Sequence, residues 1–230
     1  MAGDVVTARP DTDEFAELSR SLDSRSLGYR VTKRAFDIVF SAAVVAVGII
    51  PCAVLAIAIV ADTKGAPIYS QERVGRYGKP FRIYKFRSMV SDADDVEKYF
   101  TAEQLAQWQR EHKVDDDPRI TRLGRVIRKT SIDELPQFLN VLVGQISVIG
   151  PRPITYDELG EFGGDAALLC SAPGGITGKW QSTKRNSATF ESGERQAIEL
   201  DYVRRASVKE DAGVFFATFG VMFGKGKTGR

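Results

Sequence analysis

Two adjacent carboxylates, Asp133 and Glu134, stand in the stretch Arg128-Lys-Thr-Ser-Ile-Asp-Glu-Leu-Pro-Gln, and such a pair could act on a phosphate. The stretch also fits a capping box, with Ser131 as N-cap and Glu134 three residues later, and this purely structural role stays open. Pro136 favours Asp133 as the N-cap instead, because a proline is tolerated in the first helical turn. At a helix start the dipole lowers a carboxylate pKa. An ionised Asp133 could attack phosphorus, and Glu134 could hold a magnesium ion that neutralises a pyrophosphate.

Three further segments carry basic groups that suit phosphate binding. Arg152 lies between two prolines, which fix the backbone around its guanidinium. Lys85 and Arg87 share one face of a predicted strand by its two-residue period. Arg185 follows the glycine-rich segment 173–178, whose backbone amides could meet a nucleotide phosphate. Each segment alone also fits a rigid turn or a solvated surface, and only their occurrence with the carboxylate pair favours a binding site.

The composition excludes several kinds of catalysis and partner. The only histidine is His112, which lies in a strongly polar stretch, so a histidine-based triad is not expected and a multi-histidine metal site is excluded. The two cysteines, Cys52 and Cys170, have neither metal-ligand spacing nor disulfide density, and we interpret both as buried thiols in a reducing compartment. The 32 basic and 30 acidic residues nearly cancel to +2, which does not indicate a nucleic-acid partner.

An uncharged stretch of 24 residues from Ile38 to Ala61 is long enough to cross a bilayer. Pro51 lies near its middle and favours a kink or break there. Basic residues flank both ends, Lys33 and Arg34 before it and a second group after it: Lys64, Arg73, Arg76, Lys79, Arg82, Lys85 and Arg87. Because positive charge marks the cytoplasmic side, two positive flanks predict a re-entrant hairpin rather than a straight span. A plain single-pass helix is the alternative.

The remaining chain predicts a small mixed domain. Two short strands are expected at 66–75 and 79–89 around a glycine turn, the second with Phe81 and Ile83 on its buried face. Helical segments are expected at 91–113, from about Asp133 to Val143 with Gly144 just after its end, at 195–205 and at 211–223, while 123–128 is a short segment in which basic and apolar residues alternate. Segment 173–178 reads as a loop. The aromatic helix at 211–223 suits either a membrane interface or an ordinary core.

A specific series of motifs resembles the bacterial sugar transferase family, the monotopic phosphoglycosyl transferases. The series comprises Tyr84-Lys-Phe-Arg-Ser-Met, Asp117-Pro-Arg-Ile-Thr-Arg-Leu-Gly, the stretch from Arg128 to Gln137, Asn140-Val-Leu-Val-Gly, Ser147-Val-Ile-Gly-Pro-Arg-Pro and Pro173-Gly-Gly-Ile-Thr-Gly. The resemblance runs from about Lys33 to Phe223. It implies an α/β fold: a small catalytic domain with few short strands, a re-entrant membrane helix-break-helix and interfacial amphipathic helices.

The resemblance also implies an activity and its residues. The enzyme would move a sugar-1-phosphate from a nucleotide diphosphate sugar, with uridine as the expected nucleoside, to polyprenyl (undecaprenyl) phosphate. Asp133 would be the nucleophile and Glu134 the Mg²⁺ ligand, while the phosphate and substrate contacts would be Arg128, Arg152, Arg185, Lys85 and Arg87. Pro51 would break the membrane hairpin behind Lys33 and Arg34. Two departures from the family pattern are Lys184, where a Gly is usual before Arg185, and Ile50, where a Ser is often found before Pro51.

The sequence predicts one domain layout, and two functions remain as alternatives to the covalent sugar-phosphate transferase. We expect a mobile extension at 1–32, a membrane hairpin at 33–62, a catalytic domain at 63–224 on the cytoplasmic face of the bacterial inner membrane, and a basic tail at 225–230. The expected partners are the nucleotide sugar, the polyprenyl phosphate and the membrane; a homodimer is left open. The first rival is a non-enzymatic membrane adaptor for glycan assembly. The second is an enzyme that transfers the phosphosugar directly in a ternary complex with two metal ions.

Overall fold

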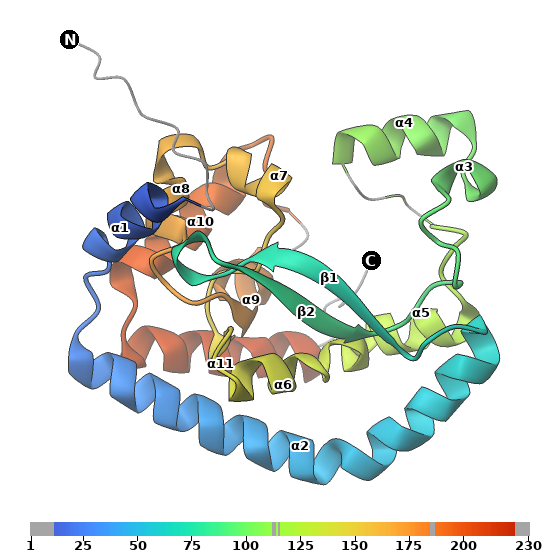
Figure 1. Ribbon diagram of the computed structural model, residues 1–230, viewed down its shortest axis with the longest axis horizontal. Coiled ribbons are helices and arrows are strands. Elements are labelled where there is room, and N and C mark those ends of the chain that lie inside the picture. The colour runs from blue at the N-terminus through green and yellow to red at the C-terminus, as the bar shows by residue number, and fades with distance from the viewer. Residues whose placement is uncertain (1–11, 112–113, 115, 185–186, 224–230) are drawn as a thin grey trace. The chain divides into compact units, whose positions relative to one another are not determined.

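A computed structural model describes residues 12–111, 114, 116–184 and 187–223 (Figure 1). These residues divide into two compact units, and each unit is described by itself. The first contains residues 12–46, 70–83 and 137–223, and the second contains 47–69 and 84–136. The described chain is mostly helical, with a few short strands in two-stranded sheets. This is the small α/β architecture that the sequence predicts.

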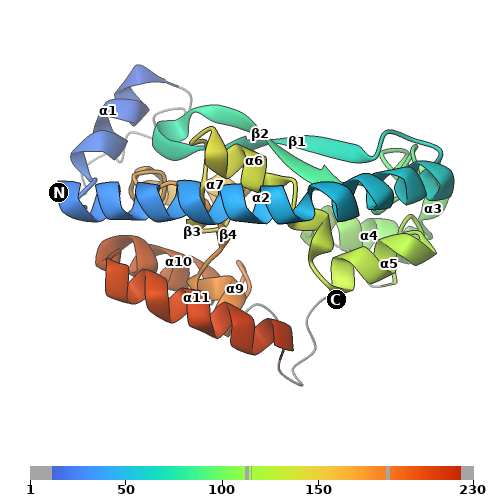
Figure 2. The ribbon, with the colours of Figure 1, turned by 90° about the horizontal axis from the view of Figure 1, so that it is seen from below.

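The longest element is helix α2, Leu27–Thr63, which contains the uncharged stretch. Among the described residues it is the one helix long and apolar enough to cross a membrane, and only 6% of its most apolar window is buried. Pro51 lies inside this helix, which is drawn as one unbroken ribbon in Figure 2. The complete break expected at Pro51 is therefore not observed, and the kink that Pro51 also favours stays a prediction. The re-entrant topology itself stays a prediction.

The predicted strand pair is confirmed as β1, Ile68–Val74, and β2, Pro80–Phe86, joined by the 3-10 turn η1, Arg76–Gly78. Phe81 and Ile83 are buried, whereas Arg82 and Tyr84 between and after them are exposed, as the alternation predicts.

A second sheet pairs β3, Ser147–Ile149, in parallel with β4, Gly175–Thr177. The expectation of a loop at 173–178 was wrong for these three residues. The strands need glycines because their backbones approach closely: a Cβ on Gly175 would lie 2.1 Å from the Gly150 nitrogen. In the sequence, glycines that allow this approach resemble turn residues. The pairing of β4 with a distant strand cannot be recognised from local sequence, so the strand was not predicted.

Helices build the rest of the first unit. They are α1 Asp13–Ser21, α6 Gln137–Leu142, α7 Tyr156–Gly160, α8 Ala166–Leu169, α9 Lys179–Thr183, α10 Glu194–Arg205 and α11 Val208–Phe223, with the 3-10 turn η3 Gly163–Asp165. The helices expected at 195–205 and 211–223 are confirmed by α10 and α11. On α11, Val214 is buried and Phe215 packs edge-on against Phe36 and Phe40 of α2, while Phe216 is 71% exposed.

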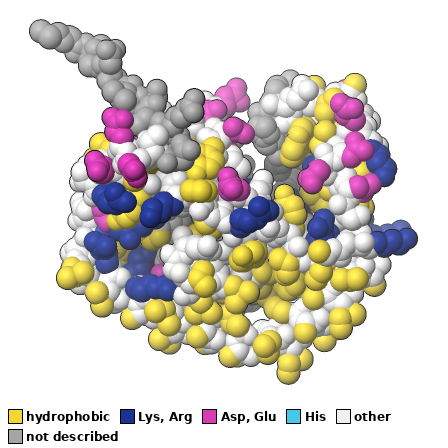
Figure 3. Space-filling view, in the orientation of Figure 1, with side chains coloured by type: hydrophobic (Ala, Val, Ile, Leu, Met, Phe, Trp, Pro, Cys, Tyr) yellow, Lys and Arg dark blue, Asp and Glu magenta, His cyan; other side chains and the backbone are white. Residues whose placement is uncertain are grey.

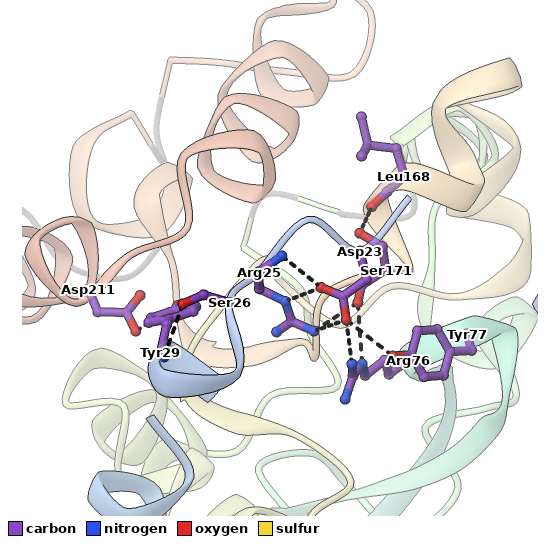
Figure 4. Close-up of polar contacts among 9 residues, drawn as sticks. All are labelled: Asp23, Arg25, Ser26, Tyr29, Arg76, Tyr77, Leu168, Ser171 and Asp211. Atoms are coloured by element: carbon purple, nitrogen blue, oxygen red, sulfur yellow. Dashed lines mark hydrogen bonds and ion pairs between the residues drawn. The ribbon is translucent and has the colours of Figure 1, made fainter. Parts of the chain in front are cut away.

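Part of the segment 1–32, which we expected as a mobile extension, is helical, because α1 and the start of α2 lie in it; residues 1–11 lie outside the described residues. α1 buries Phe15 and Ala16, and the turn after it is fixed through Asp23 (Figure 4). Asp23 accepts hydrogen bonds from Arg25 at 2.8 Å and from Arg76 at 2.6 Å. The segment contains few apolar residues, and the ion pairs of Asp23 with Arg25 and Arg76 supply the other contacts that hold it in place. The predicted domain boundaries stay a prediction, and the basic tail lies outside the described residues.

The second unit contains α3 Val96–Tyr99, α4 Ala102–Glu111, α5 Arg122–Lys129 and the 3-10 turn η2 Ile132–Glu134. Its core joins Ile59, Phe86 and Ile127. Residues of α2 pack against this core with the spacing of one helix face: Cys52, Leu55, Ala56 and Ile59. Cys52 is only partly buried, unlike Cys170, so the expectation of two buried thiols holds for Cys170 alone.

Candidate active site

The carboxylate Asp133 lines a pocket in the second unit together with basic side chains. The lining includes Lys85, Arg87 and Arg128, and also Tyr69, Ser88 and Asp94. The end of β2 and the chain just after it provide Lys85 and Arg87, α5 provides Arg128, and η2 provides Asp133. Lys85 and Arg87 thus reach one pocket, as their two-residue spacing predicts.

The backbone around Asp133 differs from the expected helix start. Thr121 caps the beginning of α5 by accepting the Gly124 N–H at 2.8 Å, and α5 ends at Lys129. Ser131 then adopts a left-handed conformation with φ 56°. The turn η2 follows, and α6 begins only at Gln137, after Pro136. Asp133 therefore lies within a single 3-10 turn and is not the N-cap of an α-helix.

The electrostatics of Asp133 also differ from the expectation. Burial raises its pKa above the ordinary value, and the neighbouring Glu134 charge raises it further, while Lys85 and Arg128 act in the opposite direction. The low pKa expected at a helix N-terminus was wrong, because a 3-10 turn of three residues lacks the aligned dipoles of a helix. A more basic carboxylate is a better nucleophile once it is ionised, and the two cations favour the ionised form.

Glu134 forms an ion pair with Lys85, with its Oε1 3.1 Å from the Lys85 Nζ, and both side chains are mostly buried. The Arg87 side chain is held by two contacts near the beginning of β1. Its Nε donates to the Ala66 carbonyl at 2.7 Å, and its guanidinium carbon lies 6.0 Å from the Tyr69 ring centroid. The structure thus brings Lys85, Arg87, Arg128, Asp133 and Glu134 into one unit.

Arg152 and Arg185 are the other two predicted phosphate ligands. Arg152 belongs to the first unit, in the turn directly after β3, and its backbone N–H donates to Glu199 Oε1 at 3.3 Å. Arg185 lies outside the described residues, so its predicted role stays a prediction.

Asp133 and Glu134 could supply only some of the ligands of a magnesium ion. Among the described residues no cluster of three or more His, Cys, Asp or Glu side chains could hold a metal. Mg²⁺ in phosphoryl transfer typically takes one or two protein carboxylates and completes its shell with water and substrate phosphates. The pair Asp133 and Glu134 meets that smaller requirement.

The basic residues predicted to flank the membrane hairpin bind partners within the protein. Lys33 is 7% exposed and its Nζ lies 2.8 Å from Asp211 Oδ2. Arg34 donates to the carbonyls of Val141 at 2.6 Å and Leu142 at 2.8 Å, which caps the end of α6. These two charges therefore serve the packing of α2, a role that the sequence reading missed.

Two buried aspartates, Asp211 and Asp37, also hold α2 in place. The sequence did not identify either of them as a packing residue. Asp211 accepts hydrogen bonds from Tyr29 at 3.0 Å and Tyr202 at 2.6 Å, in addition to Lys33. Asp37 accepts from the Ser147 hydroxyl and the Val148 N–H, both at 2.9 Å. The available signal was the spacing of Tyr29, Lys33 and Asp37, four residues apart on one helix face.

Comparison with known proteins gives a consistent result. A family model described as "Bacterial sugar transferase" matches residues 28–225. A UDP-galactose-lipid carrier transferase of Erwinia amylovora is 41% identical over 196 residues, which cover 84% of this chain and 40% of the relative. An undecaprenyl-phosphate galactose phosphotransferase of Salmonella typhimurium is 41% identical over 192 residues, covering 82% and 40%. The exopolysaccharide production protein ExoY of Sinorhizobium fredii is 35% identical over 192 residues, covering 82% of this chain and 84% of the relative. The chain thus spans about two fifths of the first two relatives.

Proposed function

Because the chain belongs to the bacterial sugar transferase family, we propose that it transfers a sugar-1-phosphate from a nucleotide diphosphate sugar to a polyprenyl phosphate. The single observation that carries this proposal is the pocket in which Asp133 lies with Lys85, Arg87 and Arg128. A carboxylate among cations suits a nucleophile that must approach an anionic pyrophosphate. The product would be the first lipid-linked intermediate of a bacterial glycan such as an exopolysaccharide, capsule or O-antigen, or of a glycoprotein.

The reaction proceeds as two successive displacements at the β-phosphorus, with Asp133 as the nucleophile in the first and as the leaving group in the second. An Asp133 oxygen attacks the β-phosphorus, and the bond from that phosphorus to the bridging oxygen breaks, so the nucleoside monophosphate leaves with the bond electrons. The sugar phosphate is then held on Asp133 as a mixed anhydride. A phosphate oxygen of the lipid attacks the same phosphorus, and Asp133 leaves as a carboxylate. A covalent step suits one soluble and one membrane-held substrate, because a single site meets them in turn.

The neighbouring side chains bind and orient the phosphates. Lys85, Arg87 and Arg128 offset the charge of the diphosphate, and Lys85 also keeps Glu134 beside Asp133 through their ion pair. Glu134 would hold a magnesium ion, which when bound neutralises charge on the pyrophosphate. Arg152 and Arg185 are assigned as further phosphate contacts from the family resemblance.

The relatives suggest the substrates. The names of two of them include galactose, one as a UDP-galactose-lipid carrier transferase and one as an undecaprenyl-phosphate galactose phosphotransferase. UDP-galactose and undecaprenyl phosphate are therefore the first donor and acceptor to test. This assignment is part of the proposal, because the chain spans only part of these two relatives.

The protein acts at the cytoplasmic face of the inner membrane, with α2 as a re-entrant anchor. Residues of each unit contact α2 differently: Lys33 and Asp37 form polar contacts within the first, and Cys52, Leu55, Ala56 and Ile59 belong to the hydrophobic core of the second. Within the uncharged stretch of this helix apolar side chains remain exposed, most strongly Val39, Val47, Ile49, Ile50, Val54 and Ile57. Figure 3 shows hydrophobic side chains gathered along the edge where α2 runs. A helix with protein on both ends and apolar surface between them suits insertion from one face.

Incubation with labelled UDP-galactose and Mg²⁺, without lipid acceptor, tests the chemistry. We expect uridine monophosphate in about one equivalent per enzyme and the label bound to the protein. Asp133→Asn should abolish the adduct, and Glu134→Gln should raise the Mg²⁺ concentration needed for half-maximal adduct formation roughly tenfold, because an amide is a poorer ligand for a hard cation.

One other result would exclude the covalent route, and another would exclude the transfer itself. Nucleotide release that requires the acceptor, with no label on the protein, would support direct transfer in a ternary complex. Absence of any nucleotide release would support the adaptor.

A further inference from the structure

Two aspartates line the pocket of the second unit, and the proposed chemistry uses only one of them. Asp133 is the proposed nucleophile, whereas Asp94 belongs to the turn that precedes α3. The Asp94 side chain is exposed, and among the described residues no hydrogen bond or ion pair reaches its carboxylate. A carboxylate without a partner at a ligand pocket can accept hydrogen bonds from the ligand.

The chain that carries Asp94 is held by a buried arginine of the same unit. Arg119 is 4% exposed, and its Nη1 donates to the carbonyl of Ala93, the residue before Asp94, at 2.9 Å. The Arg119 guanidinium carbon lies 4.4 Å from the Phe100 ring centroid and 4.7 Å from that of Trp108. Because two rings pack on this guanidinium, the backbone beside Asp94 has a defined place at the pocket.

Further contacts fix the same part of the pocket wall. Asp117 accepts a hydrogen bond from Nη2 of Arg119 at 2.6 Å, which holds the guanidinium from another side. The Val90 N–H donates to the Arg119 carbonyl at 3.0 Å, and Met89 forms an antiparallel β-bridge with Ile120. A side chain on a wall that is fixed in this way can discriminate between ligands.

The position of Asp94 suits neither a metal ion nor a phosphate. Among the described residues no three acidic side chains are grouped so that they could hold a metal, so Asp94 does not join Asp133 and Glu134 around one ion. The oxygens of a diphosphate are anionic, so a carboxylate repels them, and they belong beside Lys85 and Arg128. The group that suits Asp94 is neutral and carries hydroxyl donors.

The donor contains two groups of this kind, the transferred sugar and the ribose of the nucleoside. The pocket has a volume of about 180 Å³, which is less than the roughly 300–1,000 Å³ of pockets that enclose a drug-sized ligand, so it takes only part of a nucleotide sugar. In the proposed reaction the β-phosphorus lies at Asp133. The sugar is joined to that phosphorus through one oxygen, whereas the α-phosphate separates it from the ribose. The sugar is therefore the hydroxyl-bearing group nearest to the reacting centre.

We propose that Asp94 is a specificity-determining residue, whose carboxylate accepts hydrogen bonds from hydroxyl groups of the transferred sugar. The inference rests on the proposed function, because it takes the Asp133 pocket as the place where the donor reacts. It goes further by assigning sugar selectivity to a carboxylate outside the reacting pair. A sugar that lacks or misplaces the matching hydroxyl is rejected, because it leaves the carboxylate without a donor.

The first test compares UDP-galactose, UDP-glucose and UDP-N-acetylgalactosamine by kcat/KM, with undecaprenyl phosphate as acceptor. Asp94→Ala should lower kcat/KM about tenfold for the donor that the parent prefers and less for the others, so that the ratios between donors fall toward one. Asp94→Glu keeps the charge and displaces the carboxylate by one methylene, so it should also reduce these ratios. Asp95→Ala is the matched control, since that carboxylate is exposed and does not line the pocket, and it should leave the ratios unchanged.

The second test separates the sugar from the ribose. Calorimetry in an Asp133→Asn background, which prevents turnover, gives the Kd of UDP and of the UDP-sugar that the parent binds most tightly. If Asp94 contacts the sugar, Asp94→Ala should raise the ratio of the UDP-sugar Kd to the UDP Kd about tenfold. An equal rise in both Kd values would assign Asp94 to the ribose and overturn the proposal.

Other results would overturn it as well. A loss of kcat/KM that is the same for all three donors would show a merely structural role, because such a role affects every donor alike. Asp94 variants that keep the parent's preference, or a parent without any preference, would exclude a specificity role. The proposed chemistry fails separately, through a parent that binds the UDP-sugar and releases no nucleotide, and the ratio of Kd values still tests Asp94 in that case.

Discussion

At the scale of single residues, the chemistry at Asp133 depends on an environment that its neighbours in sequence do not reveal. Residue types and spacing identified the carboxylate pair as a candidate, and its catalytic role stays a prediction. The direction of the Asp133 pKa could not be read from sequence, because it follows from burial against the pocket wall. A charged carboxylate kept in such surroundings should reduce the stability of the fold.

Asp133→Asn should therefore unfold at a higher temperature than the parent at pH 7. The folded pKa of Asp133 is raised above the unfolded value of 3.8, so its favourable contribution is complete below pH 3.8 and is lost as the pH rises through the folded pKa. The amide avoids this loss, and each kcal/mol gained raises Tm by about 2–4 °C in a domain of this size. Thermal unfolding in detergent at pH 7 and at pH 3.5 measures the difference.

At pH 3.5 the gain in Tm should nearly vanish. Asp95→Asn, an exposed carboxylate of the same unit, is the matched control and should leave Tm within about 1 °C at both values. A lower Tm for Asp133→Asn at pH 7 would show that the ionised carboxylate stabilises the fold.

At the scale of elements, the β3–β4 pair depends on glycines that allow two backbones to touch. Gly175→Ala places a Cβ 2.1 Å from the Gly150 nitrogen. The atoms that this Cβ meets belong to the backbone and cannot turn aside, so the strands must separate. We expect a loss of about 1–3 kcal/mol or more in the free energy of unfolding, measured by denaturant titration.

Gly213→Ala is the matched control, because a Cβ there meets nothing within 4 Å and the residue lies inside α11. It should be neutral or stabilising by up to about 1 kcal/mol. Equal effects of the two substitutions would contradict the close approach of β3 and β4.

The segment between α1 and α2 depends on a buried ion-pair cluster at Asp23. Burial acts to raise the pKa of Asp23, but hydrogen bonds and charge from Arg25 and a hydrogen bond from Arg76 lower it far below the usual range. The stabilisation is therefore present above the unfolded pKa of 3.8 and is lost only in stronger acid. Asp23→Asn should cost about 3 kcal/mol at pH 7, because the buried Arg25 side chain and the partly buried Arg76 side chain lose their counter-charge.

Asp165→Asn is the control for this prediction. It breaks an ion pair with Arg204 in which both side chains are about half exposed, and such a pair contributes at most about 1 kcal/mol. Chemical denaturation of both variants at pH 7 makes the comparison, and similar losses would mean that Asp23 does not fix the segment.

At the scale of the whole molecule, the topology of α2 is the main prediction. Single cysteines at the exposed positions Ser21 and Ser192, in a chain without Cys52 and Cys170, report the two sides of this helix. A re-entrant anchor keeps both positions cytoplasmic, so neither should react with an impermeant thiol reagent on intact cells and both should react after lysis. Labelling of one position from outside would establish a spanning helix.

The sequence by itself determined the features that reside in local pattern. Hydrophobic alternation in Phe81 and Ile83, the length of the uncharged stretch and the order of the motifs are enough for the strand pair, the long helix and the family. Each of these depends on residues close together in the chain, where a period or a spacing carries the information.

Only the tertiary structure decided the partners of the charged residues. Lys33 binds Asp211 at a separation of 178 residues and Arg34 caps α6 across 107, although both read as membrane flanks in the sequence. The same holds for β4, for Glu199 beneath the Arg152 turn and for the raised pKa of Asp133. The physical reason is that desolvation and ion pairing are set by the atoms within a few ångströms, and folding brings those atoms from elements that no local spacing connects.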